Sequence, residues 1–181
     1  MLRGARFSPC KTWRYSLTRE WLTGEGKQLL LMLNPSDADA LRDDSTTTLM
    51  VKRTQRDGFR RYEAANLFGL VDSDPAALYR HPDPIGPEND LAILSAIHDA
   101  DRIIVAWGNN GHHLDRAKAV LRLLGERELW CFGVTKSGEP RFPRAIPRDL
   151  PLQPYSPLMF DAMETEGAGD GQEGRYEDRN D

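Results

Sequence analysis

Side chains that can hydrogen-bond a small ligand follow each of four apolar segments in the sequence. The segments are residues 28–33, 64–68, 102–108 and 128–134. A side-chain amide both donates and accepts, so it can hold a water molecule or the edge of a base, and lysine and arginine can contact phosphate. The predicted substrate-binding residues at these four ends are Ser36, Asn66, Trp107, Gly108, Asn109, Lys136 and Arg141.

Asn34, directly after the first segment, is a candidate catalytic residue that positions water. Asn34, Pro35 and Ser36 also suit a simple turn, because asparagine and serine cap backbone groups and proline keeps the preceding residue out of the helical region. The position at the end of a buried segment favours a site. Trp107 likewise has two interpretations, since it can stack on a base or cover the sheet as part of the core.

Asp43 and Asp44 precede a predicted helix that begins in "STTT". Aspartate is an ordinary N-cap, and a carboxylate is favoured at the positive end of the helix dipole. In the functional interpretation one aspartate caps the helix and the other points into the site as a general base, so both are candidate catalytic residues. Neither His nor Glu stands at ligand spacing nearby, and we predict no metal and no cofactor.

A basic segment, "KRTQRDGFRRY", lies within and after the same helix. Its cations are Lys52, Arg53, Arg56, Arg60 and Arg61. Such a group is ordinarily a solvated helix face, but phosphate backbones are contacted by the same side chains. Both interpretations stay open.

The apolar segments alternate with helical patterns. Residues 102–108 and 128–134 are near-continuous apolar runs, typical of strands covered on both faces. Residues 112–125 and 86–100 have apolar side chains at spacings of three and four, which predicts two amphipathic helices. Their predicted apolar positions are Leu114, Ala117, Val120, Leu121 and Leu124 in the later helix and Leu91, Leu94, Ala96 and Ile97 in the earlier one.

We therefore predict an α/β fold, a three-layer sandwich around a central, mainly parallel four-stranded sheet. Trp13, Tyr15 and Leu17 alternate with polar residues, which predicts an additional N-terminal edge strand or hairpin. Ligands of open α/β sheets bind at the carboxyl ends of the parallel strands. The polar residues that follow the four segments are therefore expected to meet at one edge.

Charge is unevenly divided along the chain. The formal net charge is -4, but residues 161–181 carry eight acidic residues and two arginines, or -6, which leaves +2 for residues 1–160. Because the last segment is rich in glycine and charge, we predict a disordered acidic tail after a single domain of residues 1–160. The slightly basic domain is compatible with a nucleic-acid or nucleotide partner without requiring one.

We expect a cytoplasmic protein without a membrane partner. No stretch is apolar for long enough to span a bilayer, and the N-terminus lacks the apolar centre of a secretory signal. Cys10 and Cys131 form neither a disulfide framework nor a metal-ligand spacing. Protein partners are not indicated by the sequence.

Six motifs in a fixed order resemble the DUF1643 family, a set of bacterial and phage proteins without a settled activity. They cover roughly residues 7–150, nearly the whole predicted domain. The motifs are "FSPCKTWRYSLTREW", "LMLNPSDADALRDDSTT", "GFRRYEAANLFGLVDSDPAALY", "PIGPENDLAIL", "IIVAWG" and "LWCFGVTKSGEPRFP".

A looser resemblance is to the uracil-DNA glycosylase superfamily. There, an apolar strand ends in Asn-Pro or Asp-Pro, a second strand ends in an Asn that reads a base, and a late strand precedes a loop with His-Pro. The resemblance implies a glycosylase-like fold, in which Asn34 positions or activates water, Asn66 contacts a base edge and residues 136–143 form the late loop. Phe142 stands where the pattern has histidine, so the expected donor to a leaving base is missing.

Two functions remain open on these grounds. One is an N-glycosidic hydrolase of the DNA-glycosylase kind, acting on a nucleic-acid base or a nucleotide, and Asp43 and Asp44 favour it. The alternative is a catalytically silent module that binds a nucleotide or single-stranded nucleic acid, and Phe142 favours that one.

Overall fold

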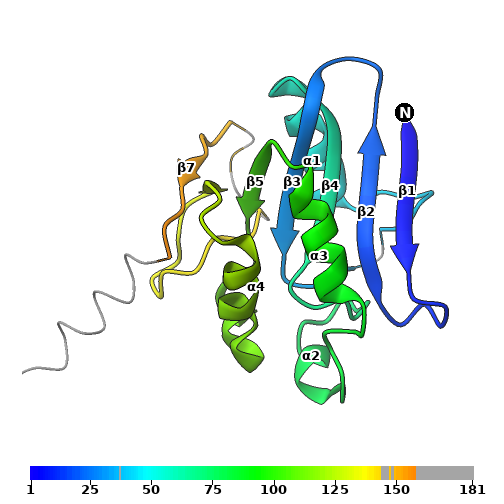
Figure 1. The fold of residues 1–181 in the computed structure, drawn as a ribbon, viewed down its shortest axis with the longest axis vertical. Helices are drawn as coiled ribbons and strands as arrows, with labels where there is room; N and C mark the ends of the chain where they lie inside the picture. The colour runs from blue at the N-terminus through cyan, green and yellow to red at the C-terminus, as the bar shows by residue number, and fades with distance from the viewer. Residues whose placement is uncertain (37, 144–146, 148, 158–181) are drawn as a thin grey trace, which may run out of the picture.

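A mixed sheet crosses the molecule, with strand order β1-β2-β4-β3-β5-β6-β7 (Figure 1). This computed structural model describes residues 1–36, 38–143, 147 and 149–157. The predicted acidic tail therefore lies outside the described residues. The strands are β1 (Leu2–Phe7), β2 (Arg14–Glu20), β3 (Glu25–Met32), β4 (Phe59–Asn66), β5 (Arg102–Val105), β6 (Leu129–Cys131) and β7 (Gln153–Pro154).

The central strands β4, β3, β5 and β6 run parallel and correspond to the four apolar segments. An antiparallel β1–β2 hairpin extends one edge, and β7 pairs antiparallel with β6 at the other. The prediction of a mainly parallel four-stranded sheet was therefore wrong, because the seven strands of the described chain form a mixed sheet. β7 was not predicted because its two residues are exposed and give no apolar signal.

Helices lie on both faces of the sheet (Figure 1). α1 (Ser45–Arg56) covers one face, and α3 (Asn89–His98) and α4 (Arg116–Leu124) cover the other, with the short α2 (Ala77–Arg80) beyond the strand ends. A 3₁₀ segment, η1 (Asn109–Asp115), precedes α4. None of the helices in the described ranges combines the length and apolar character that crossing a bilayer requires.

The buried faces of two helices differ from the predicted ones. In α3, Leu91 and Leu94 are exposed, whereas Ala92 and Ile93 are buried. The cause is Asn89, which is fully buried and donates its amide hydrogens to the carbonyl oxygens of residues 66 and 67. This contact fixes the rotation of α3 about its axis. Leu114 is also exposed, because it precedes α4 and has a φ of 54°.

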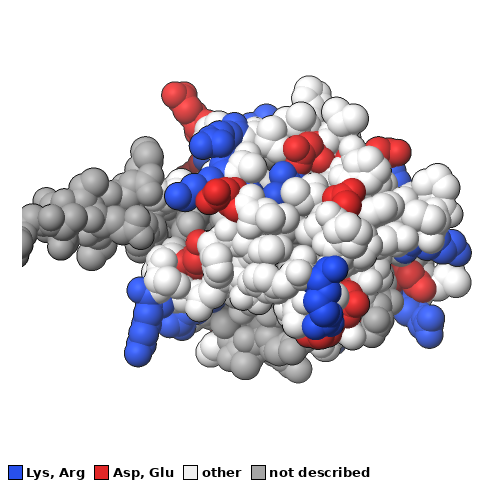
Figure 2. Space-filling model, turned by 90° about the horizontal axis from the view of Figure 1, so that it is seen from below, with Lys and Arg blue, Asp and Glu red and all other residues white. Residues whose placement is uncertain are grey.

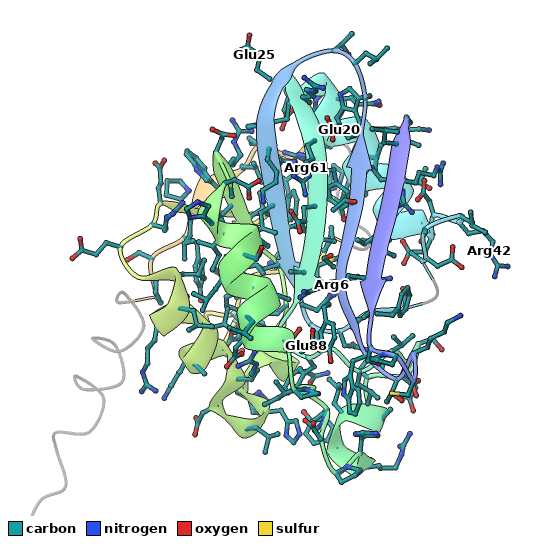
Figure 3. All side chains as sticks on the ribbon, turned by 45° about the vertical axis from the view of Figure 1, so that its right-hand side comes forward. Arg6, Glu20, Glu25, Arg42, Arg61 and Glu88 are labelled. Carbon is teal, nitrogen blue, oxygen red and sulfur yellow. The ribbon has the colours of Figure 1, made fainter. Side chains whose placement is uncertain are left out.

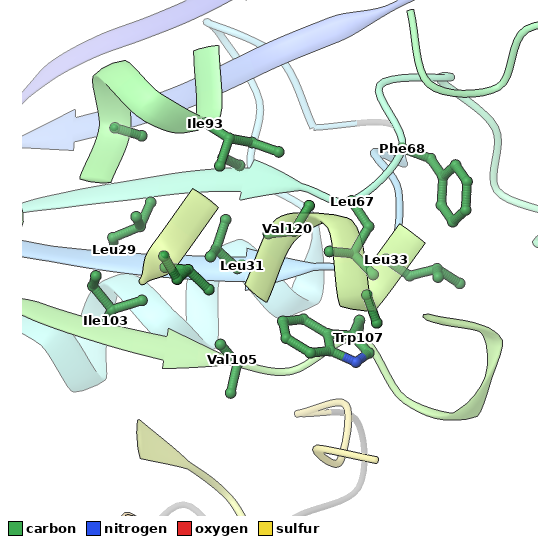
Figure 4. Close-up of a cluster of buried hydrophobic side chains, with 14 of the residues drawn as sticks. Leu29, Leu31, Leu33, Leu67, Phe68, Ile93, Ile103, Val105, Trp107 and Val120 are labelled. Atoms are coloured by element: carbon green, nitrogen blue, oxygen red, sulfur yellow. The ribbon is translucent and has the colours of Figure 1, made fainter. Parts of the chain in front are cut away.

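The sheet separates two hydrophobic cores. Leu29, Leu31 and Val105 face α3 and α4, where they contact Ile93 and Val120 (Figure 4). Neighbouring strand residues point to the opposite face and form the core under α1, which includes Leu30, Met32, Tyr62, Ala64, Ile104 and Met50. The even-numbered residues of β3, β4 and β5 therefore face α1, and this alternation decides where the polar side chains of the strand ends point.

Candidate functional site

The carboxyl ends of the four parallel strands lie at the lower edge of the sheet in Figure 1. Asn34, Asn66, Gly108 and the loop with Lys136 follow these ends, so they share one edge as predicted. The chain crosses from β3 to β4 on one side, and then from β4 to β5 on the other side of β3, which makes this edge a topological switch point. Seen from below, it is mostly uncharged, with scattered lysine, arginine and acidic side chains (Figure 2).

The late loop is fastened to the end of β5. Trp107 lies in the core between β5 and α4 (Figure 4), and its Nε1 donates to Glu139 Oε2 at 2.6 Å. The backbone N–H of Gly108 donates to the carbonyl of Pro140 at 2.8 Å. Burial raises the pKa of Glu139, although the hydrogen bond from Trp107 opposes this shift. Glu139 was not among the predicted residues, because an acidic residue in a loop carries no distinctive sequence signal.

Two more of the predicted side chains form hydrogen bonds in the same region. Asn109 Oδ1 accepts a hydrogen bond from Ser137 Oγ at 2.9 Å, and Arg141 Nε donates to the carbonyl of Val134 at 2.9 Å. Lys136 is exposed on the turn of the loop. The structure thus brings the predicted residues of β5 and β6 together, but Trp107, Asn109 and Arg141 bond to the protein itself.

Asn34 is tied to a neighbouring loop. Its Nδ2 donates to the carbonyl of Asp72 at 2.8 Å and to that of Pro35 at 3.2 Å. These two bonds fix the orientation of the carboxamide and use its donor group. The oxygen Oδ1 is left to accept a hydrogen bond from a ligand or water, since an amide offers both functions.

Both aspartates before α1 have partners. Asp44 is the N-cap: its Oδ1 accepts from the backbone N–H of Thr47 at 2.6 Å, and its Oδ2 accepts from Ser36 Oγ at 2.5 Å. Burial raises the pKa of Asp44, but these hydrogen bonds outweigh it, and the pKa lies below the ordinary value. Asp43 pairs with the buried Arg19, whose Nη2 lies 2.6 Å from Oδ1. Asp44 therefore faces Ser36, whereas Asp43 anchors a strand to the loop.

The predicted basic segment is divided among different surfaces. Arg60 pairs with Glu20 at 3.1 Å, and Arg61 lies over the sheet near the C-terminal end of α3 (Figure 3), where it reaches Asp99 at 3.5 Å. The cations on α1, in contrast, line the outer side of that helix. The segment is thus not one continuous patch.

Arg14 enters the site through an irregularity in the edge hairpin. In the β1–β2 pairing, Arg6 lies opposite Ser16 and Phe7 opposite Arg14, so Tyr15 is an extra residue. Such a bulge re-aims the side chains that flank it. Arg14 is consequently buried, and its Nη1 donates to the carbonyl of Ala38 in the loop before α1. Strict alternation would have placed Arg14 in solvent, which is why the sequence did not indicate it.

Tyr62 and Asn66 lie on the α1 face of β4, and neither has any exposed surface. In the described residues, Tyr62 Oη, Arg14 Nε and both polar atoms of the Asn66 carboxamide have no hydrogen-bond partner. Burial raises the pKa of Tyr62 and lowers that of Arg14, and each is affected by the charge of Asp44. Hydrogen bonding and charge link Ser36, Asp44, Arg14 and Tyr62, and Asn66 lies on the same face of β4 as Tyr62. We refer to these five residues as the carboxyl-end polar cluster.

Asn66 stands apart from the other fully buried amides of the described chain. Gln28 donates to Thr54 Oγ1 at 2.7 Å and Asn89 donates to two backbone carbonyls, so in these two amides of the described chain only the oxygen lacks a partner. In Asn66 both the nitrogen and the oxygen lack one among the described residues. A buried polar group without a partner costs roughly 1–3 kcal/mol, so an amide with both ends unpaired is a substantial loss of stability. Stability does not explain why an amide with both polar atoms unpaired is buried at this position.

Comparisons with known proteins bear on the whole cluster. A family model described as a protein of unknown function (DUF1643) matches residues 14–144, well over half of the chain. The chain belongs to the DUF1643 family. The match begins at Arg14 and includes Ser36, Asp44, Tyr62 and Asn66, so the cluster lies within the DUF1643 domain. No curated protein and no solved structure matches the chain.

The DUF1643 domain does not gather metal ligands in its described part. No three His, Cys, Asp or Glu side chains there come close enough together to hold an ion. The chemistry that the cluster offers is therefore hydrogen bonding: a carboxamide donor and acceptor, a phenol, a guanidinium and an ionised carboxylate.

Proposed function

We propose that this DUF1643 protein recognises a nucleobase through the carboxyl-end polar cluster, as a module that binds a nucleotide or single-stranded nucleic acid. The observation that carries the proposal is the buried, unpartnered carboxamide of Asn66. Its donor and acceptor stand side by side, the arrangement with which asparagine pairs with two adjacent groups on a base edge. A bound base would satisfy both atoms at once.

The surroundings of Asn66 support a flat, polar ligand. Met32 and Ala64 line the same face of the sheet and can cover an aromatic ring, while Tyr62 Oη and Arg14 Nε supply further donors. Because Asn66 has no exposed surface, the base must displace part of the structure that covers it. A bound base would then supply hydrogen-bond partners to the polar atoms of Asn66, whereas a purely structural role leaves these atoms unpaired.

Hydrolysis of an N-glycosidic bond is the second candidate, and Asn34 favours it. The bonds from Nδ2 to Asp72 and Pro35 hold the carboxamide in place, so Oδ1 can accept a hydrogen from a water molecule. In this reaction the water oxygen would bond to the anomeric carbon, the bond to the base would break, and the base would leave with a proton. Phe142 cannot donate that proton, so base recognition is the primary proposal.

Binding is tested by titrating the full-length protein with single nucleosides in a calorimeter. We expect at least one nucleoside to bind and Asn66→Leu, a substitution of similar shape, to abolish its binding. The matched control is Gln28→Leu, a buried amide on the same face that already has a partner in Thr54. Equal affinities for wild type and Asn66→Leu would refute the proposal.

Hydrolysis is tested separately on oligonucleotides that contain damaged or modified bases. If the protein is a hydrolase, abasic sites accumulate with time, and Asn34→Ala stops their formation while base binding persists. Binding without abasic product across the panel would leave recognition as the function and exclude hydrolysis of these substrates.

A further inference from the structure

Two adjoining hollows follow the solvent side of α1. The first, of about 360 Å³, lies at the C-terminal end of the helix, with Arg102 and Trp130 in its wall. The second, of about 430 Å³, continues along the helix to Ser45. Arg53 and Arg56 line both hollows, so the two adjoin, and we call them together the α1 groove.

One end of the α1 groove lies next to Asp44 of the carboxyl-end polar cluster. Ser45, at one end of the groove, directly follows Asp44, and the other end lies at Asp57. The 12 residues of α1 correspond to a length of about 18 Å. A strand stacked at ~3.4 Å per nucleotide would place about five nucleotides along it, so the groove exceeds a single nucleotide.

Cations outnumber acidic groups in the groove. Lys52 and Arg56 are exposed and Arg102 is partly exposed, and they face Asp57 and Asp149. Arg56 pairs with the almost fully exposed Asp149 at 3.0 Å and with Asp57 at 3.1 Å, and Arg102 pairs with Asp57 at 3.3 Å. Lys52 has no acidic partner among the described residues. A phosphate group can therefore contact Lys52 directly, whereas at Arg56 and Arg102 it competes with Asp57 and Asp149.

Aromatic rings hold the guanidinium groups in place. The guanidinium of Arg102 lies 4.7 Å from the ring centre of Phe59, and that of Arg53 lies 5.0 Å from Phe132. Trp130, partly exposed in the wall of the groove, offers a ring on which a base can stack. Alternating cations and an aromatic wall are the features with which proteins bind single strands.

We propose that the α1 groove binds a single strand of nucleic acid and directs one of its bases to Asn66. Lys52, Arg56 and Arg102 contact phosphates, and a neighbouring base stacks on Trp130. The inference rests on the proposed base recognition and names its partner: a strand rather than a free nucleotide. A duplex does not fit, because its base edges are paired and cannot reach a buried amide without being flipped out.

The test uses the full-length protein and a fluorescently labelled thymidine octamer, with anisotropy measured over a range of salt concentrations. Three phosphate contacts predict that the logarithm of the binding constant falls with the logarithm of salt at a slope of roughly -2, about -0.7 for each contact. Lys52→Gln should weaken binding several-fold at low salt and make the slope shallower by about 0.7. Trp130→Leu should weaken binding without changing the slope, because stacking releases no counterions.

The matched control is Lys118→Gln, an exposed lysine on α4 across the sheet, which should change neither affinity nor slope. Equal slopes for Lys52→Gln and Lys118→Gln would overturn the inference. So would displacement of the octamer by polyglutamate as effective as by unlabelled octamer, which would indicate an acidic peptide as partner. Nucleoside binding that depends on Asn66 is measured independently, so the groove can fail this test while the proposed function stands.

Discussion

Two buried polar regions lie on opposite faces of the same sheet, and only one of them has satisfied its hydrogen bonds. At the amino end, Lys27 Nζ donates to Glu63 at 2.9 Å, to the carbonyl of Ala96 at 2.7 Å and to Asp99. Arg61 completes this network by pairing with Glu63 at 3.3 Å. On the α1 face, Asn66 at the carboxyl end of β4 and Tyr62 in the middle of this strand are equally buried but have unpartnered polar atoms.

This difference in hydrogen bonding distinguishes a structural region of the sheet from a candidate binding region. A buried charge with a full set of partners holds its neighbours in register, and removal of one partner leaves another charge buried and unpaired. A buried amide without partners lowers stability and holds no neighbouring group in place. The amino-end network is therefore structural, whereas the carboxyl-end polar cluster has the properties expected of a binding site.

The largest effect should come from the amino end. Lys27→Met removes the ammonium group that neutralises Glu63 and Asp99, and we expect the free energy of unfolding to fall by about 3–5 kcal/mol. Chemical denaturation monitored by circular dichroism measures it. A loss below 1 kcal/mol would show that Arg61 and solvent already neutralise the carboxylates and that the network is not structural.

At the carboxyl end, the same kind of substitution should have the opposite sign. Asn66→Leu removes two unpaired polar atoms, so the free energy of unfolding should rise by roughly 1–2 kcal/mol while nucleoside binding is lost. Asn89→Leu is the control, because this amide donates to two carbonyls and its loss should lower stability. Destabilisation by both substitutions would mean that Asn66 serves the fold.

Tyr62→Phe should give a smaller gain, visible mainly at high pH. Burial raises the pKa of Tyr62 above its ordinary value of 10.0, so the folded state keeps the phenol protonated while the unfolded state ionises. Stability from this group is complete below pH ~10 and is lost as the pH rises further. Thermal melts from pH 8 to 11 should show a shallower alkaline decline for Tyr62→Phe than for wild type. If the melting temperatures of the two proteins declined in parallel with pH, the alkaline loss of stability would not come from Tyr62.

The smallest effect should come from outside both regions. The composition of residues 161–181 offers little apolar surface to bury, so truncation after Leu158 should leave the melting temperature within a few degrees. The difference in melting temperature between the truncated and the full-length protein also defines the change that counts as no effect in the other melts. A large drop would mean that this segment stabilises the domain.

Continuous apolar runs in the sequence located β5 and β6, and the predicted segments also overlap β3 and the end of β4. The start of β4 at Phe59 was missed because its first residues include two arginines. The ends of the predicted segments placed Asn34 and Asn66 at the edge that the parallel strands share. The rotation of α3 was not predictable, since it depends on one buried contact of Asn89 with β4. Arg14 was missed because a single extra residue in β2 reverses the direction of its side chain.

The side-chain amide of Asn66 allows the most direct test of the central claim, because its hydrogens report on their own partner. In a heteronuclear NMR titration of the full-length protein with the nucleoside that binds best, the Asn66 Nδ2 resonances, assigned by their loss in Asn66→Leu, should move progressively and reach saturation. The Asn89 side-chain resonances should stay in place. Saturable shifts elsewhere in the protein with Asn66 unchanged would place the ligand at another site and contradict the account.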